Sequence, residues 1–327
     1  MDWGFIFSNT ATWLIAPETI AYAIATVGLA VHFGYGGLLN FGQAGFMALG
    51  AYGYAISILT FHLPWWVGIF VGMGAAVVFA FILGLPTLRL RADYLAIVTI
   101  AAAEVVRLFF NSTIWEEVTG SANGLGGYHA GFRAANPIPP GTYGFGPFQF
   151  NESDWWVRIF GILLLVISLI VVWLLMRSPW GRVVKGVRED EDAVRALGKN
   201  VFSVKMQVLV LGGVLGSLGG VVLALPSAVV PGVYLPSLTF FLWTILLLGG
   251  AATILGPVLG AVAFWLIMAF LSVLLPAMAS AGLLPFMSTV QAGIVRFIIV
   301  GVALMLIVVF RPQGFLGNKK EMTFNAR

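Results

Sequence analysis

Two pairs of polar side chains interrupt segments that are otherwise apolar. Glu104 and Arg107 are three residues apart, so a helix places them on one face. Because charges inside a membrane are costly and are usually paired or functional, we expect a structural ion pair that pins helices together rather than direct contact with a substrate. Asn40 and Gln43 are also three residues apart, near the start of an apolar segment. They either line a transport path or hydrogen-bond to a neighbouring helix, and the sequence favours the two roles equally.

A charged segment, residues 177–205, separates two apolar runs. Its four consecutive acidic residues, 189–192, suit the first turn of a helix, where free backbone N–H groups favour negative charge. An apolar stripe follows, and then a glycine that would end the helix. Because four acids disfavour the negative cytoplasmic membrane surface, we expect this helix to bind a protein partner. The residues expected to matter are Arg188, Glu189, Glu191, Ala193, Val194, Leu197 and Gly198.

The sequence lacks the usual motifs of nucleotide, metal and catalytic sites. No G-x-x-x-x-G-K-[ST] loop occurs, since the only Gly-Lys pair, Gly198-Lys199, is followed by asparagine and has no upstream glycine. The histidines His32, His62 and His129 have no ligand spacing, and there is no cysteine. We therefore expect no cofactor, no metal and no enzymatic activity, which leaves a transporter, a channel or a membrane scaffold.

The elements that carry these residues are predicted to be membrane helices. Hydrophobic residues make up 60% of the chain and charged residues 9%, whereas soluble domains have about 25% charged residues. Positions 19–88 and 206–295 contain no Asp, Glu, Lys or Arg. Continuous apolar runs such as 162–175 are typical of helices and not of the alternating strands of a membrane barrel. The sequence thus predicts an all-α polytopic membrane protein.

About nine membrane helices are expected, with eight to ten compatible with the pattern, because each crossing needs about 20 apolar residues. They form one membrane domain over residues 1–327. The start of the chain has no Lys or Arg before Pro17, so we expect no signal peptide. The expected helices are near 18–34, 40–60, 65–86, 93–111, 155–176, 202–225, 237–250, 257–276 and 290–310.

Basic residues predict the orientation of these helices. Cytoplasmic loops of membrane proteins are enriched in Lys and Arg, and this also explains the net charge of +4 without any nucleic-acid partner. The basic stretches follow the third, fifth and last helices, so the 177–201 loop and the C-terminus are expected in the cytoplasm. The 112–154 loop is then expected outside. With nine helices, the N-terminus is expected outside as well.

Several separated stretches resemble one known family. Residues 191–198, EDAVRALG, resemble the EAA-type coupling loop of ABC importer permeases, although the chain has Asp192 where a strict motif has alanine. The wider chain resembles branched-chain amino-acid permeases of the LivM type, except that Gln43 stands where the family often has histidine. The stretches are GLLNFGQAGFMALGAY (37–52), LRADYLAIVTIAAAEVVRL (90–108), TGSANGLGG (119–127), SPWGRVVKGVREDEDAVRALG (178–198), GGAATILGPVLGA (249–261) and FRPQGFLG (310–317).

The resemblance implies one half of a heterodimeric pore in a bacterial cell membrane. It implies a sister LivH-type permease, two cytosolic ATPase subunits that dock on the coupling helix, and an extracytoplasmic substrate-binding protein. The implied substrates are leucine, isoleucine and valine. Urea or short amides are the close alternative, and an ATP-independent channel or secondary transporter is the alternative of a different class.

Overall fold

The computed structural model describes residues 2–89, 92–282, 287–310 and 314–317, and most of this part of the chain is helical, with only two short strands. The predicted all-α fold is confirmed. The longer helices are α1 (Trp3–Thr12), α2 (Pro17–Leu29), α3 (Gln43–Leu59), α4 (Trp65–Thr87), α5 (Ala92–Asn111), α8 (Glu152–Arg177), α9 (Pro179–Glu189), α11 (Val201–Ala224), α12 (Pro236–Gly249), α13 (Gly256–Ser280) and α14 (Thr289–Phe310).

Short elements occupy the connections. A π-helix, η2 (Ala30–Tyr35), continues α2, and the 3-10 helix η1 (Trp13–Ile15) joins α1 to α2. The strands β1 (Thr142–Tyr143) and β2 (Phe150–Asn151) pair antiparallel. The remaining elements are η3 (Thr113–Trp115), α6 (Glu116–Thr119), η4 (Ser121–Asn123), α7 (Ala130–Ala134), α10 (Glu191–Ala196) and η5 (Pro231–Val233).

Each of the nine predicted segments contains a helix, and the structure adds α1, which the sequence did not predict. Asp2 caps α1, since its Oδ1 accepts the Phe5 N–H at 3.1 Å. This helix is only 10 residues long, so it lacks the length by which membrane helices are recognised in sequences. It packs against α13.

The helices differ in whether they can cross a membrane. Among the described residues, α4, residues 94–111 of α5, α8, α11 and α13 are long and apolar enough, and the bent pair 3–15 and 17–35 could supply a sixth span. Three further apolar helices, α3, α12 and 289–302, are shorter. The 14 residues of α12 cover about 21 Å, whereas the hydrocarbon core is about 30 Å thick. The number of crossings stays a prediction.

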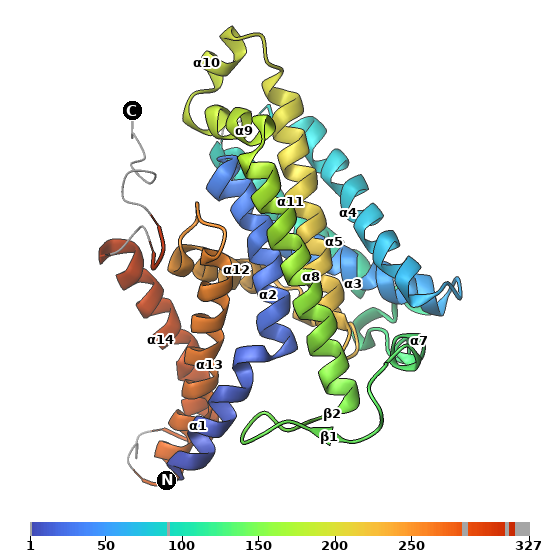
Figure 1. Cartoon of the computed structure of the whole chain (residues 1–327), viewed down its shortest axis with the longest axis vertical. Coiled ribbons are helices and arrows are strands. Elements are labelled where there is room, and N and C mark those ends of the chain that lie inside the picture. The colour runs from blue at the N-terminus through green and yellow to red at the C-terminus, as the bar shows by residue number, and fades with distance from the viewer. Residues whose placement is uncertain (1, 90–91, 283–286, 311–313, 318–327) are drawn as a thin grey trace.

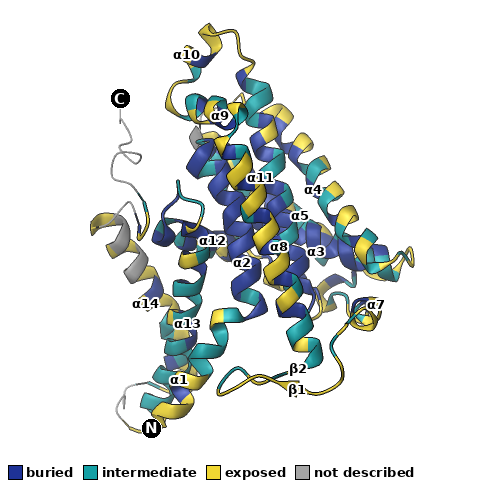
Figure 2. Ribbon diagram, viewed as in Figure 1, coloured by how far each residue is buried: buried dark blue, intermediate teal, exposed yellow. Residues whose placement is uncertain are grey.

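Helix α11 lies at the centre of the fold because its glycines let other backbones approach closely. It packs against α2, α3 and α4. A Cβ at Gly212 would collide with the His32 ring, and one at Gly220 would collide with the Met47 carbonyl. The glycine spacing of four therefore serves helix packing, as predicted. Figure 2 shows α2 buried along most of its length, whereas α4 and α8 present exposed turns to the outside.

The polar connections lie at opposite ends of the helix bundle (Figure 1). Helices α9 and α10 project at one end, and the 112–154 connection, with α7 and the β1–β2 hairpin, lies at the other. The sequence predicted that these two connections lie on opposite sides of a membrane, and their placement is compatible with that.

Candidate functional site

The first polar site lies where the helical backbone breaks between α2 and α3. Residues 36–42 are not helical, and Gly37 has φ +68°, a left-handed conformation that glycine adopts without strain. Backbone groups released from a helix need new partners in a membrane protein, because lipid offers none. The side chains of His32, Asn40 and Gln43 surround this break, and all three are fully buried.

Asn40 is the centre of a hydrogen-bond network at this break. Its Nδ2 lies 3.0 Å from His32 Nδ1 and donates to Gln43 Oε1 at 3.1 Å, while its Oδ1 accepts the Gly42 N–H at 2.8 Å. Because an amide nitrogen can only donate, His32 Nδ1 must accept. His32 Nε2 then carries the proton and donates to the Leu209 carbonyl, 3.0 Å away. The network thus selects one neutral tautomer of His32.

The network joins elements that are distant in the sequence. Gln43 Nε2 donates to the Ala25 carbonyl on α2 at 3.2 Å and to the Gly212 carbonyl on α11 at 3.1 Å. The indole N–H of Trp243 on α12 donates to the Asn40 carbonyl at 3.2 Å. Thr99 on α5 accepts the Phe41 N–H through its Oγ1 at 3.0 Å. Four helices are therefore positioned around one buried cluster.

These contacts show where the sequence-predicted residues Asn40 and Gln43 lie. The Asn40 side chain hydrogen-bonds to His32, Gln43 and Gly42, and the Gln43 side chain also hydrogen-bonds to carbonyl groups of α2 and α11. Sequence reasoning treated His32 as an isolated residue and missed it. The available signal was its position eight residues before Asn40 in an uncharged stretch, where a buried histidine needs a polar partner.

The Glu104–Arg107 pair forms as its spacing predicts. Arg107 Nε donates to Glu104 Oε2 at 2.9 Å, and Arg107 Nη2 donates to Glu104 Oε1 at 2.5 Å. Both residues belong to α5, as their spacing predicted, and the role of the pair in holding helices together stays a prediction. A helix places residues three apart side by side, and the bidentate contact closes on α5 itself. The side chains are 16% (Arg107) and 32% (Glu104) exposed.

The charged connection between α8 and α11 contains two helices, whereas the sequence predicted one that starts at Glu189. Ser178 caps α9 and Pro179 occupies its first turn, a start signal that sequence reasoning missed. Glu189 is the last residue of α9. Asp190 has an extended backbone and caps α10, since its Oδ1 accepts the N–H groups of Asp192 at 2.9 Å and Ala193 at 3.0 Å. The acidic run is therefore divided between a helix end, a cap and a first turn.

The apolar stripe predicted on this segment is also divided. Val194 is buried against Val187 and Val201, whereas Ala193 is exposed and Leu197 is 79% exposed. The three side chains do not share one face, because α9 covers the Val194 side of the short α10. Gly198 has φ +75°, the left-handed conformation that its position predicted.

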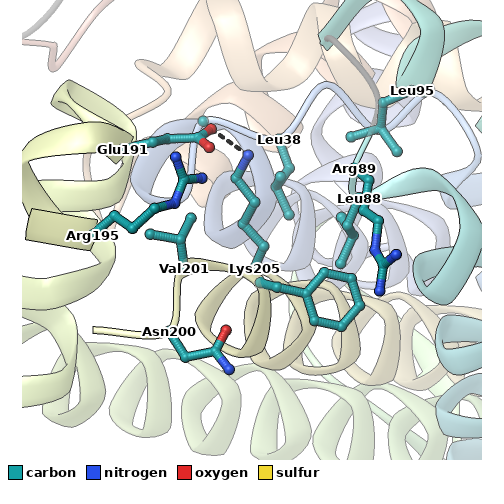
Figure 3. A pocket seen from close by; sticks show the side chains of 11 residues that line it. Leu38, Leu88, Arg89, Leu95, Glu191, Arg195, Asn200, Val201 and Lys205 are labelled. Atoms are coloured by element: carbon teal, nitrogen blue, oxygen red, sulfur yellow. Dashed lines mark ion pairs between the residues drawn. The ribbon is translucent and has the colours of Figure 1, made fainter. Parts of the chain in front are cut away.

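Several contacts connect this segment to the membrane helices, among them a hydrogen bond from Trp180 Nε1 on α9 to Gln207 Oε1 on α11 at 2.6 Å. Arg188 on α9 donates through Nη1 to the Gly34 carbonyl in η2 at 2.5 Å. Glu191 on α10 forms an ion pair with Lys205 on α11 (Figure 3). The Arg188 contact lies two residues from His32, so the structure brings the charged segment next to the buried network. The sequence did not predict this proximity.

A cavity of about 670 Å³ opens beside these contacts. It lies between the α10–α11 junction and the chain around Arg89, and the Arg89 guanidinium sits 5.6 Å from the centre of the Phe202 ring. Three basic side chains and one acid line it (Figure 3). They are Arg89, Arg195, Lys205 and Glu191. Within the described residues, no group of three or more His, Asp or Glu side chains is arranged to hold a metal ion.

Comparison with known proteins relates this sequence to transport systems. The family described as the permease component of branched-chain amino acid transport systems matches residues 12–310. The high-affinity branched-chain amino acid transport system permease protein LivM of Escherichia coli (strain K12) is 33% identical over 272 residues, which cover 80% of this chain and 63% of that protein. The chain therefore spans less than two thirds of the length of that relative.

Two further relatives show the range of the similarity. The probable branched-chain amino acid transport permease protein LivM of Methanocaldococcus jannaschii is 26% identical over 340 residues, with 92% of each chain covered. The nucleoside ABC transporter permease protein NupC of Lactococcus lactis is 26% identical over 196 residues, which cover 58% of this chain and 59% of NupC. Because the family match covers most of the chain and the fold is a bundle of apolar helices, the chain is a multi-pass protein of the cell membrane that belongs to the permease-component family of branched-chain amino acid transport systems.

Proposed function

We propose that the chain is a permease subunit of an ABC importer that moves branched-chain amino acids across the membrane while separate subunits hydrolyse ATP. The exposed end of α10 carries this proposal. Leu197 follows α10 on this charged segment, and 79% of its surface is exposed, so it is accessible to another protein. The sequence has no phosphate-binding loop, which is consistent with ATP being hydrolysed elsewhere.

The proposed ATPase contact has two routes into the membrane helices. A displacement of α10 reaches α11 through the Glu191–Lys205 ion pair. A displacement of α9 reaches η2 through the Arg188 hydrogen bond to Gly34, and η2 is the continuation of α2. Since α2 and α11 are the central helices of the bundle, both routes end in the core. The segment 177–201 thus acts as a coupling loop, and the side on which it lies is the cytoplasmic side.

The complete importer would contain a sister permease, two ATPase subunits and a binding protein on the outer side. The proposed substrate class follows the relatives that are named for branched-chain amino acids and cover most of this chain. A nucleoside is the second candidate, because NupC, named for nucleosides, matches more than half of the chain. Uptake of labelled leucine and labelled nucleosides by the same proteoliposomes distinguishes the two.

The proposed function is tested with Leu197→Asp in the reconstituted complex. A charge in an apolar contact should weaken ATPase association at least tenfold and reduce ATP-driven uptake in proportion. The control is Phe145→Asp, because Phe145 is 78% exposed at the opposite end of the bundle. ATPase affinity is measured by co-sedimentation with proteoliposomes. If both variants bind the ATPases like the parent chain, the coupling contact is not at α10.

A further inference from the structure

The cavity of about 670 Å³ at the α10–α11 junction, called the basic cavity below, carries more positive than negative charge. Its charged lining residues are Arg89, Arg195, Lys205 and Glu191. Ion pairs among the described residues occupy Lys205 and Arg195 but leave Arg89 without an acidic partner. Figure 3 shows Arg89 across the cavity from Arg195. An anion that enters between the two arginines would therefore meet net positive charge.

The start of α11 adds hydrogen-bond donors to the basic cavity. Asn200 and Val201 line the cavity where this helix begins, and the first N–H groups of a helix favour negative charge. Asn200 Oδ1 caps α11 by accepting the Ser203 N–H at 3.1 Å, so the Nδ2 group is the part of this amide that can donate to a ligand. Arginine side chains and helix starts are common partners of phosphate groups. The chemistry of the cavity therefore suits a phosphate.

The basic cavity lies at the ends of two candidate membrane spans. Helix α4 ends at Thr87 and α11 begins at Val201, and both helices are long and apolar enough to cross a membrane. Leu88 and Arg89, which directly follow α4, line the cavity. Lipid headgroups lie at this level of a bilayer, just outside the hydrocarbon core. The phosphate group of a membrane lipid could thus reach the cavity from within its own leaflet.

A second hollow, called the α4–α11 groove below, adjoins the basic cavity. Helices α4 and α11 pack side by side (Figure 1), and the groove of about 300 Å³ lies between them. Met206 lines the groove and directly follows Lys205, which lines the basic cavity. On α4, Phe81 lines the groove about two helical turns before Leu88, so both lie on one face of that helix.

The α4–α11 groove suits an acyl chain. Five of its six lining residues are apolar, and the side chain of the sixth, Gln207, accepts the indole N–H of Trp180 at 2.6 Å. The rise from Met206 to Val214 is about 12 Å, comparable with the roughly 15 Å that one leaflet contributes to the hydrocarbon core. The groove is lined by Phe81, Met206, Gln207, Val210, Leu211 and Val214.

We propose that the two hollows together bind one anionic phospholipid, with its phosphate group in the basic cavity and an acyl chain in the α4–α11 groove. The net positive charge of the cavity selects an anionic headgroup over a zwitterionic one, and the groove selects a lipid over a soluble phosphate. The bound phosphate competes with Glu191 for Lys205. This inference does not depend on the proposed function, because lipid binding is measured without transport.

Lipid binding to the purified full-length chain in detergent tests the inference. Native mass spectrometry compares phosphatidylglycerol with phosphatidylcholine of identical acyl chains. Arg89→Gln removes the cation that has no acidic partner, and Arg89→Lys retains the charge. The control Arg133→Gln removes an exposed arginine at the opposite end of the bundle. Val210→Trp fills the groove, and its control Val78→Trp places the same side chain on an exposed position of α4 that does not line the groove.

We expect the parent chain to prefer phosphatidylglycerol over phosphatidylcholine at least tenfold. Arg89→Gln should lower the affinity for phosphatidylglycerol about fivefold, the usual contribution of one basic side chain near a membrane surface, whereas Arg89→Lys should retain it. Val210→Trp should lower the same affinity at least threefold. Equal affinities of the parent chain for the two lipids, or equal losses in a variant and its control, would overturn the inference. The comparison of the two lipids on the parent chain needs no variant, so it tests the inference even if a substitution impairs folding.

Glycerol 3-phosphate separates a lipid from a soluble ligand with the same phosphate chemistry. It has no acyl chain, so an excess should leave phosphatidylglycerol bound to the parent chain. Displacement of the lipid by glycerol 3-phosphate, together with full lipid affinity in Val210→Trp, would assign the basic cavity to a soluble phosphate and overturn the lipid site.

Discussion

The buried network at the α2–α3 break and the charged α9–α10 segment differ in where their contacts are completed. The network side chains His32, Asn40 and Gln43 are fully buried and find their partners within this chain. The α9–α10 segment leaves Leu197 largely exposed, and the Arg195–Asp192 ion pair on it is exposed to solvent. The buried network, whose polar groups are paired within this chain, fixes the positions of the helices around it. The exposed surface of the α9–α10 segment remains available to a partner protein. Arg188 joins the two regions through Gly34.

The largest effect is expected when the buried network at the α2–α3 break loses its central residue. Asn40→Ala leaves His32 Nδ1, Gln43 Oε1 and the Gly42 N–H without partners in the interior. At about 1 kcal/mol for each unsatisfied group, the free energy of unfolding should fall by about 3 kcal/mol. Thermal unfolding of the purified chain in detergent measures the change. The control Gln149→Ala removes an exposed amide and should cost less than about 0.5 kcal/mol. Equal midpoints for the two variants would contradict the structural role of the network.

A smaller effect is expected in the α9–α10 segment, where a substitution should impair coupling to ATP hydrolysis and leave folding intact. Gly198→Val forces a β-branched residue into the left-handed conformation at the end of α10, at a cost of about 1–2 kcal/mol. We expect substrate-stimulated ATP hydrolysis in the assembled complex to fall at least tenfold while membrane insertion is unchanged. Gly146 also has a positive φ, +55°, and open space around it, but it lies at the opposite end of the bundle. Gly146→Val should therefore retain coupling, and an equal loss in both variants would show that the effect is not specific to α10.

The smallest effect is expected at the contact that joins the two regions. Arg188→Gln removes the charged donor to the Gly34 carbonyl but leaves the exposed surface of α10 intact. Uptake per ATP hydrolysed should fall about fivefold, because one charge-assisted hydrogen bond contributes about 1 kcal/mol when it is partly exposed. ATPase affinity should not change. The control is Arg195→Gln, which breaks only the exposed pair with Asp192. A matching decrease in that variant would remove Arg188 from the coupling route.

The helical membrane fold and the spacing of the charged pair follow from the amino-acid sequence alone. Long uncharged stretches predict helices because a membrane requires internal backbone hydrogen bonds, and all nine predicted segments contain a helix. Glu104 and Arg107 interact because residues three apart are neighbours on any helix. The left-handed conformation of Gly198 also follows from local chain chemistry. Each of these features depends on residues that are close in the sequence.

The pairing of polar groups that are distant in the sequence depends instead on how the helices pack in space. His32 and Leu209 are 177 positions apart, and Gln43 and Gly212 are 169 apart, so no local pattern indicates that they form hydrogen bonds. Packing also decided that Val194 points inward while Leu197 remains exposed, because α9 covers only one side of α10. The sequence predicted that this helix begins at Glu189, whereas α10 begins at Glu191 because Asp190 caps it. Burial and pairing depend on which surfaces meet in space, and the sequence specifies those surfaces only through the folded chain.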